Sequence, residues 1–136
     1  MITRKLNLKG DDSWMQDCFI SPFTVNGDKF MSVYQYLVYE KAKLFNRKDI
    51  ISTIKRTTSV KDLVSLDHSI NVEDTRFWRD VYNDCKNIAT IQKFACNDEL
   101  RQKLIHTDYS LPYTVIGGRV DFGVLKSVQF IMQYNL

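Results

Sequence analysis

The segment that decides the fold lies early in the chain, where residues 19–45 read FISPFTVNGDKFMSVYQYLVYEKAKLF. Asn26 and Gly27 separate two short apolar-rich pieces and tolerate positive φ at both turn positions, which predicts a β-hairpin. Ser32 is a suitable N-cap for a helix that runs to about Phe45. Apolar residues cover most of the circumference of that helix, so we expect it to be buried at the centre of a domain.

More helices are predicted after this segment. Two short ones, over residues 47–56 and 59–66, precede a long helix over residues 73–94 that carries one mainly apolar stripe at helical spacing. Glu73 and Asp74 fall in the expected first turn of the long helix, where carboxylates suit the helix dipole.

The last third of the chain carries weaker signals. Asn97 or Asp98 is a suitable cap for a further helix, the Gly117-Gly118 pair marks a turn, and residues 122–134 form a final helix or a pair of strands. The elements together predict an α+β fold that is mainly helical, with a small antiparallel sheet.

The composition suits one packed domain over residues 1–136 and excludes several classes of protein. Apolar residues are 44% of the chain, and no apolar run reaches the ~18 residues that span a bilayer. No signal-like segment stands near the start, so we expect a soluble, cytoplasmic protein without a membrane partner. The net charge of +3 predicts a mixed, solvated surface, with a phosphate-binding or nucleic-acid-binding patch as the alternative.

Metal and cofactor chemistry has no candidate residues. Cys18, Cys85 and Cys96 are widely spaced and form no C-x-x-C pair, and His68 and His106 stand at no ligand spacing from them. No P-loop motif is present, so no cofactor is predicted. Alanine and proline are scarce while Lys, Asn, Ile and Tyr are plentiful, which suggests an AT-rich genome such as that of many phages, and hence a protein of the host cytoplasm.

Several short motifs follow one another in a definite order. FISPF at 19–23 precedes the expected hairpin, SVYQY at 32–36 opens the first helix, and EKA at 40–42 lies near the end of that helix. Trp78 in the long helix is followed by KFACNDEL at 93–100 and LIHTD at 104–108. Over about residues 19–125 this order resembles the NADAR superfamily, the fold of N-glycosidases that act on ADP-ribose-like and riboflavin-precursor nucleotides.

The resemblance also implies acidic residues that this sequence lacks. The glutamate of the family's S-V-E-H motif falls on Tyr34 and its histidine on Gln35. A later family glutamate falls near Tyr113, and Arg119 stands where the family has an aspartate, although Asp121 takes that role if the loop differs in length. Cleavage of an N-glycosidic bond develops positive charge on the sugar, which a carboxylate stabilises, so these losses argue against hydrolysis.

The resemblance and the residue chemistry give a set of candidate site residues. The candidate catalytic acid, if the protein hydrolyses its ligand, is Asp121. Two lysines are candidates for contact with phosphate and three aromatic residues for contact with a heterocycle or pocket wall; these five are Lys41, Lys93, Tyr34, Trp78 and Tyr113. The structural alternative is that the lysines reach solvent along apolar surface and the aromatic residues belong to the core.

Two functions follow as hypotheses. In the first, the chain is a diverged NADAR-fold protein that binds a nucleotide, an ADP-ribose-like molecule or a host protein without hydrolysis. In the second, it is an active N-glycosidase on an ADP-ribosyl or riboflavin-pathway nucleotide. Contact with nucleic acid is expected only through ADP-ribosylated bases. An acid within hydrogen-bond reach of a pocket floored by Tyr34 and Trp78 favours the second hypothesis, whereas a pocket filled by tyrosine side chains favours a structural or protein-binding role.

Overall fold

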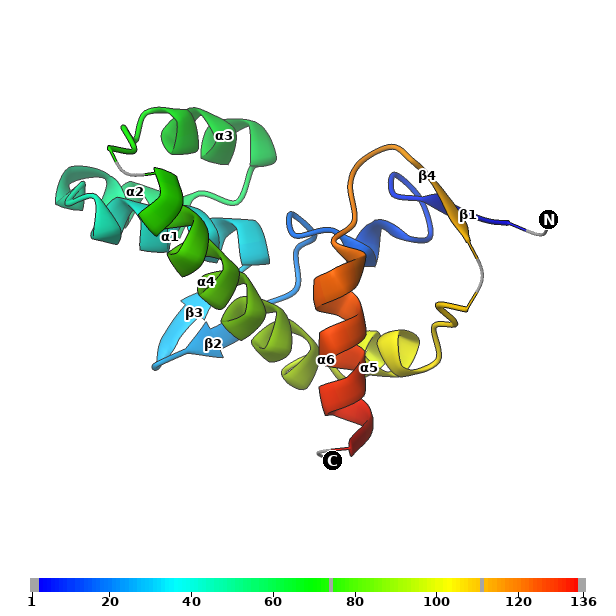
Figure 1. Cartoon of the computed structure of the whole chain (residues 1–136). Coiled ribbons are helices and arrows are strands. Elements are labelled where there is room, and N and C mark those ends of the chain that lie inside the picture. The colour runs from blue at the N-terminus through cyan, green and yellow to red at the C-terminus, as the bar shows by residue number, and fades with distance from the viewer. Residues whose placement is uncertain (1–2, 74, 111, 135–136) are drawn as a thin grey trace.

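The computed structural model describes residues 3–73, 75–110 and 112–134 (Figure 1). This part of the chain forms six α-helices, two short pairs of strands and one 3-10 turn. In chain order the elements are β1 (Arg4–Asn7), η1 (Ser13–Met15), β2 (Phe23–Val25), β3 (Asp28–Phe30), α1 (Val33–Leu44), α2 (Lys48–Arg56), α3 (Val60–His68), α4 (Thr75–Ala95), α5 (Asp98–Ile105), β4 (Tyr113–Ile116) and α6 (Phe122–Tyr134).

The hairpin and the first helix form as the sequence predicts. Asn26 and Gly27 have φ of 51° and 84°, and the turn they make pairs β2 antiparallel with β3, with Phe23 opposite Phe30. Ser32 caps α1, because its hydroxyl oxygen accepts a hydrogen bond from the Gln35 N–H at 3.1 Å. The α+β class with a small antiparallel sheet is thus confirmed.

Helix α1 lies at the centre of the first of two hydrophobic clusters, as its apolar surface predicts. It packs against α2, α3 and α4. The Tyr36 ring contacts Phe30 edge to face at a centroid distance of 5.0 Å, which joins the hairpin to the helix. The cluster is closed by buried residues of the later helices, namely Ile54, Leu63, Cys85 and Ala89.

The second cluster joins the two ends of the chain. Leu6 and Leu8, Trp14 and Met15 pack with Phe94 and with buried residues of α5 and α6. Helix α4 belongs to both clusters, since Cys85 and Ala89 lie in the first and Phe94 in the second. In Figure 1, α4 accordingly runs from the α1–α3 group on the left to α5 and α6 on the right.

A parallel pair of strands was not predicted. β1 pairs with β4 in a register that sets Arg4 opposite Tyr113. The turn after β4 packs closely on the first loop: a Cβ at Gly118 would lie 2.6 Å from the Gln16 side-chain oxygen, so only glycine fits here without displacing Gln16.

Two predicted details differ, and one of two predicted alternatives is observed. The long helix begins at Thr75, so Glu73 precedes it instead of lying in its first turn; Asp74 falls outside the described residues. Asn97 is the N-cap position of α5, but its side-chain amide donates to the Pro22 and Lys93 carbonyls and leaves the helix N–H groups uncapped. Residues 122–134 form one helix and no strands.

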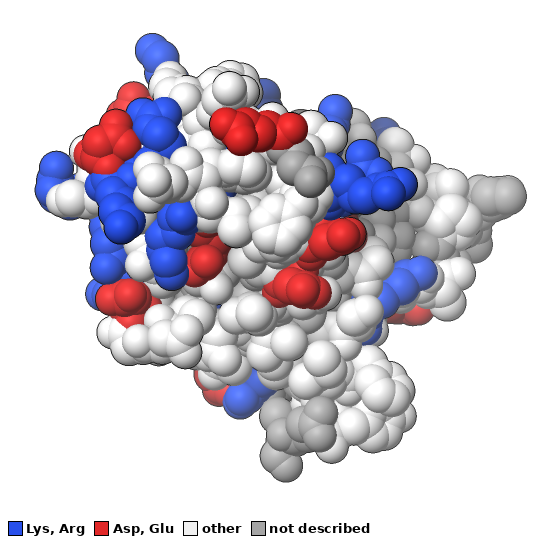
Figure 2. Space-filling view, turned by 60° about the vertical axis from the view of Figure 1, so that its left-hand side comes forward, with Lys and Arg blue, Asp and Glu red and all other residues white. Residues whose placement is uncertain are grey.

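No helix among the described residues has the length and hydropathy to cross a membrane. On the face shown in Figure 2, Lys and Arg side chains gather toward the left edge, whereas the centre is mostly uncharged and holds acidic groups.

Candidate functional site

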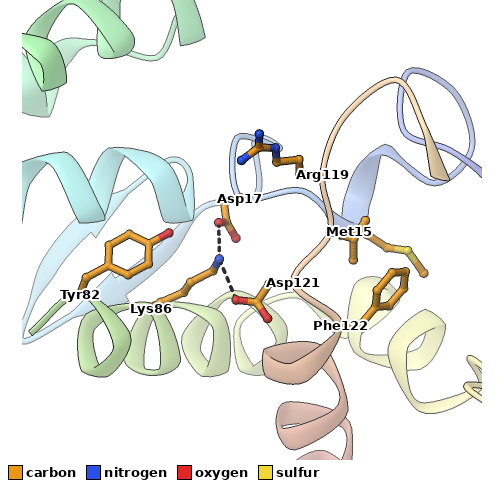
Figure 3. Close-up of a pocket in the computed structure, with 8 residues that line it drawn as sticks. Met15, Asp17, Tyr82, Lys86, Arg119, Asp121 and Phe122 are labelled. Atoms are coloured by element: carbon orange, nitrogen blue, oxygen red, sulfur yellow. Dashed lines mark ion pairs between the residues drawn. The ribbon is translucent and has the colours of Figure 1, made fainter. Parts of the chain in front are cut away.

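A buried lysine in the middle of α4 joins three distant parts of the chain. The Lys86 side chain is only 10% exposed, and its ammonium lies 3.1 Å from an Asp17 carboxylate oxygen and 3.0 Å from one of Asp121 (Figure 3). Asp17 follows the 3-10 turn near the start of the chain, and Asp121 immediately precedes α6. One cation therefore holds together the N-terminal loop, the central helix and the C-terminal helix.

The charges of this cluster stabilise one another. Burial disfavours the charged form of Lys86, but the two carboxylates outweigh that effect and raise the lysine pKa. Burial likewise disfavours the Asp121 carboxylate, but the hydrogen bond from Lys86 and the N–H of Val124 outweigh it and lower the Asp121 pKa. Lys86 and Asp121 are thus both ionised at neutral pH.

The cluster lies in a cleft of about 440 Å³. Tyr82 lies one helical turn from Lys86 on α4, and Figure 3 shows Arg119 on the Asp17 side of the cleft and Phe122 on the side of Asp121. The full lining is Met15, Asp17, Tyr82, Lys86, Arg119, Val120, Asp121 and Phe122. Two carboxylates, two cations and two aromatic rings thus face one cavity of a size suited to a small molecule.

Local hydrogen bonds hold both acidic residues. The backbone oxygen of Asp17 accepts from the N–H of Tyr34 at 2.9 Å, which ties the loop to the first turn of α1. Asp121 caps α6: its side-chain oxygen accepts from the Val124 N–H at 3.1 Å. The Asp17 backbone and the Asp121 carboxylate are therefore held in place before any ligand arrives.

Asp121 is the one predicted residue that the structure brings into this cleft. The two candidates from α1 lie outside its lining. The Tyr34 hydroxyl donates to an Asp67 carboxylate oxygen at 2.9 Å, and the Lys41 ammonium lies 2.6 Å from the other oxygen of the same carboxylate. Burial and the bond to Asp67 raise the Tyr34 pKa, so its hydroxyl stays neutral. These two side chains join α1 to α3.

The other three candidates also lie beside the cleft and do not line it. Trp78 is half-buried and contacts the rings of Tyr82 and Phe45 at centroid distances of 5.8 and 6.1 Å. Tyr113 stacks on Phe122 at 5.4 Å, on the side of Phe122 that faces a second hollow. Lys93 is 2% exposed and donates to backbone carbonyls beneath the cleft.

Two residues of the cluster were missed by the sequence reasoning. Lys86 lies one turn beyond Tyr82 on α4, and a lysine at that position is usually solvent-exposed. Asp17 lies in an irregular loop that carries no motif. Neither residue had a sequence signal, because their pairing depends on contacts between segments far apart in the chain.

Comparison with known proteins supports the fold. A family model described as the NADAR domain matches residues 7–111. The chain is also similar to the NMR structure of the E. coli protein YbiA, with a TM-score of 0.70 and 17% identity, covering 99% of this chain and 86% of that one. At that identity the likeness shows the fold alone. No curated protein matches the chain.

Proposed function

The chain belongs to the NADAR domain family, and on that premise we propose that the cleft around Lys86 binds a nucleotide or ADP-ribose-like ligand without hydrolysing it. The cleft holds both cations and carboxylates, which suit the phosphate and the ribose hydroxyls of such a ligand. Arg119 is exposed and can pair with phosphate in a bidentate manner. Asp17 and Asp121 can accept hydrogen bonds from ribose hydroxyls, and Tyr82 and Phe122 offer ring faces to a heterocycle.

The observation that carries the proposal is the pairing of both carboxylates with one ammonium, since Lys86 lies 3.1 Å from Asp17 and 3.0 Å from Asp121. General acid catalysis needs a group that holds a proton near neutral pH and can release it to the leaving group. Lys86 holds its proton too tightly, because its pKa is raised, and Asp121 has none to give, because its pKa is lowered. Lys86 also occupies one face of each carboxylate, which weakens their attraction for a developing sugar cation.

A second candidate function rests on a different property of the same residues. Asp17, Lys86 and Asp121 together carry one net negative charge, and both carboxylates border the cleft. A negative cluster stabilises an oxocarbenium-like transition state, and a leaving group that already carries a positive charge needs no proton donor. An N-glycosidase with Asp121 as its essential carboxylate is therefore the alternative.

Binding and turnover are measured separately. Isothermal titration with ADP-ribose tests binding, and chromatography of ADP-ribose, NAD, ADP-ribosylated guanine and the riboflavin-pathway intermediate tests hydrolysis. We expect ADP-ribose to bind, Arg119→Gln to weaken binding about tenfold through loss of a charged hydrogen-bonding pair, and Lys126→Gln, outside the cleft, to leave it unchanged.

The outcomes separate the candidates. Binding without product supports the proposal. Product that disappears in Asp121→Asn would replace it with the glycosidase. If none of these compounds binds, the small-molecule proposal is wrong and a host protein becomes the partner to seek.

A further inference from the structure

Lys93 is a buried cation with no ion-pair partner among the described residues. It lies in the last turn of α4 with 2% of its surface exposed. Its ammonium donates to the backbone oxygen of Trp14 at 2.6 Å and to that of Gln16 at 2.9 Å. A charged group is costly to bury, so a lysine kept in this position needs an explanation beyond packing.

The two carbonyls identify what Lys93 holds. Trp14 and Gln16 flank Met15, and Gln16 is followed directly by Asp17; both Met15 and Asp17 line the cleft. The ammonium thus hydrogen-bonds the backbone on both sides of Met15 and directly before Asp17, the two residues that form one wall of the cleft. On the far side of Asp17, the Tyr34 N–H holds its carbonyl oxygen. Lys93 is therefore the side chain that fixes the approach of this loop to α4.

Lys93 also adjoins the charge cluster directly. A recess of about 10 Å³ lies beneath the cleft and is lined by both Lys86 and Lys93, together with Asp17, Asp121 and Thr90. The Thr90 hydroxyl is buried there and has no hydrogen-bond partner among the described residues. A polar recess of this size is about large enough for one water molecule, and both lysines and both aspartates line it.

We propose that Lys93 is a positioning residue of the cleft: its ammonium fixes the backbone of residues 14–16, so that the Asp17 carboxylate meets Lys86, and removal of its proton loosens that wall. The neutral amine still donates, but without charge assistance its bonds to the two carbonyls are weaker. Deprotonation also removes one positive charge from beneath the cleft, which disfavours the binding of an anionic ligand. Both effects weaken ligand binding in the same direction.

The groups around Lys93 define the pH range. Burial lowers its pKa to about 8, and the nearby Asp17 and Cys18 oppose that shift. Lys86 and Asp121 face it across the recess, and the former stays protonated and the latter ionised over this range, since their pKa values are shifted in those directions. Because Cys18 is one of the two side chains that act on Lys93 in this way, Cys18→Ser is the matched control.

The first test needs no ligand. The carboxyl carbon of Asp17, assigned with Asp17→Asn, is followed by NMR from pH 6 to 10 beside the Lys93 side-chain signals. We expect the Asp17 signal to move together with Lys93, to do so in Cys18→Ser as well, and to stay constant in Lys93→Met. If the chemical shift of the Asp17 carboxyl carbon stays constant while Lys93 titrates, the proposal is wrong. Should Lys93→Met not fold, the unmodified protein and Cys18→Ser decide alone.

The second test rests on the proposed function. We expect the affinity for ADP-ribose to fall about tenfold when the pH rises from 7 to 9.5, as for loss of one charge-assisted bond, and Lys93→Met to bind weakly at both values. Lys103→Met, on the exposed side of α5, should keep the wild-type profile. A flat wild-type profile contradicts the positioning role. If the Asp17 signal follows Lys93 but ADP-ribose never binds, the positioning role stands and the proposed ligand is wrong.

Discussion

Gln35 and Gln129 make the same contact at the ends of two different helices. The Gln35 amide nitrogen lies 3.0, 3.2 and 2.8 Å from the carbonyl oxygens of Ile54, Lys55 and Thr57, at the end of α2. The Gln129 amide nitrogen does the same at the end of α5. It lies 2.8, 3.4 and 2.7 Å from the carbonyl oxygens of Leu104, Ile105 and Thr107. At each of the two helix ends, one side-chain amide thus donates to the last carbonyls, in addition to the backbone N–H bonds that Ile54 and Leu104 accept.

Removing the first of these amides should destabilise the protein strongly. Gln35 is 1% exposed, and its side-chain oxygen also accepts from the Met31 N–H. We expect Gln35→Leu to lower the free energy of unfolding by about 2–4 kcal/mol, because the Met31 N–H and the part-buried carbonyls of Lys55 and Thr57 lose this partner. Urea denaturation measures this. Gln133→Leu, whose amide makes one exposed bond of 3.3 Å, should change it by less than about 0.5 kcal/mol.

The Lys86 cluster should behave as a coupled unit. Lys86→Met leaves Asp17 and Asp121 close together without their common cation, and we expect a loss of about 2 kcal/mol. The carboxylates are 34% and 42% exposed, so solvent screening limits the Lys86–Asp121 coupling energy in a double-mutant cycle to about 1 kcal/mol. Additive single-variant effects would show that the three charges do not interact.

The same cluster should make folding stability depend on acidity. Because the Asp121 pKa is lowered in the folded chain, its contribution is present above the unfolded value of about 3.9 and disappears as the pH falls through the folded value. We therefore expect Asp121→Asn to flatten the acid limb of a plot of unfolding free energy against pH below about 4. Equal acid slopes in the two proteins would contradict this assignment.

Tyr109 offers a contrasting case, a buried hydroxyl that costs stability. Its oxygen has no hydrogen-bond partner among the described residues, and burial raises its pKa to about 12. We expect Tyr109→Phe to leave the unfolding free energy unchanged or to raise it by up to about 1 kcal/mol. Tyr34→Phe, which loses the bond to Asp67, should lower it by about 1–2 kcal/mol. The assignment is wrong if Tyr109→Phe lowers the unfolding free energy more than Tyr34→Phe does.

Local signals in the sequence were sufficient for much of the fold. Asn26-Gly27, Ser32 and the stripe of α4 act over a few residues, so turn chemistry, capping and periodicity predict them. β1 gives no such signal: only Leu6 of its four residues is buried, and its partner lies near the other end of the chain. Its pairing with β4 is a tertiary event that no local pattern encodes.

The site was less predictable than the fold. Asp121 was a candidate through the family resemblance, whereas Lys86 and Asp17 were not. Their ion pair joins segments far apart in the chain, and neither residue has a recognisable role without the other beside it. Tyr34 illustrates the converse. It occupies a position where the family resemblance implies an acid, and its hydroxyl donates to another acid, Asp67, whose proximity no local pattern predicts.

The parallel pairing of β1 with β4 has a consequence for how the protein is made. Of the described elements, β1 is translated first, but its only strand partner among them is translated after α5. The cluster around α1 can pack while synthesis continues, whereas the nascent N-terminal segment waits with its apolar side chains uncovered. Chaperones that bind nascent chains can contact this segment during that time. A chain that ends before residue 113 lacks Arg119, Asp121 and Phe122 and therefore has no cleft.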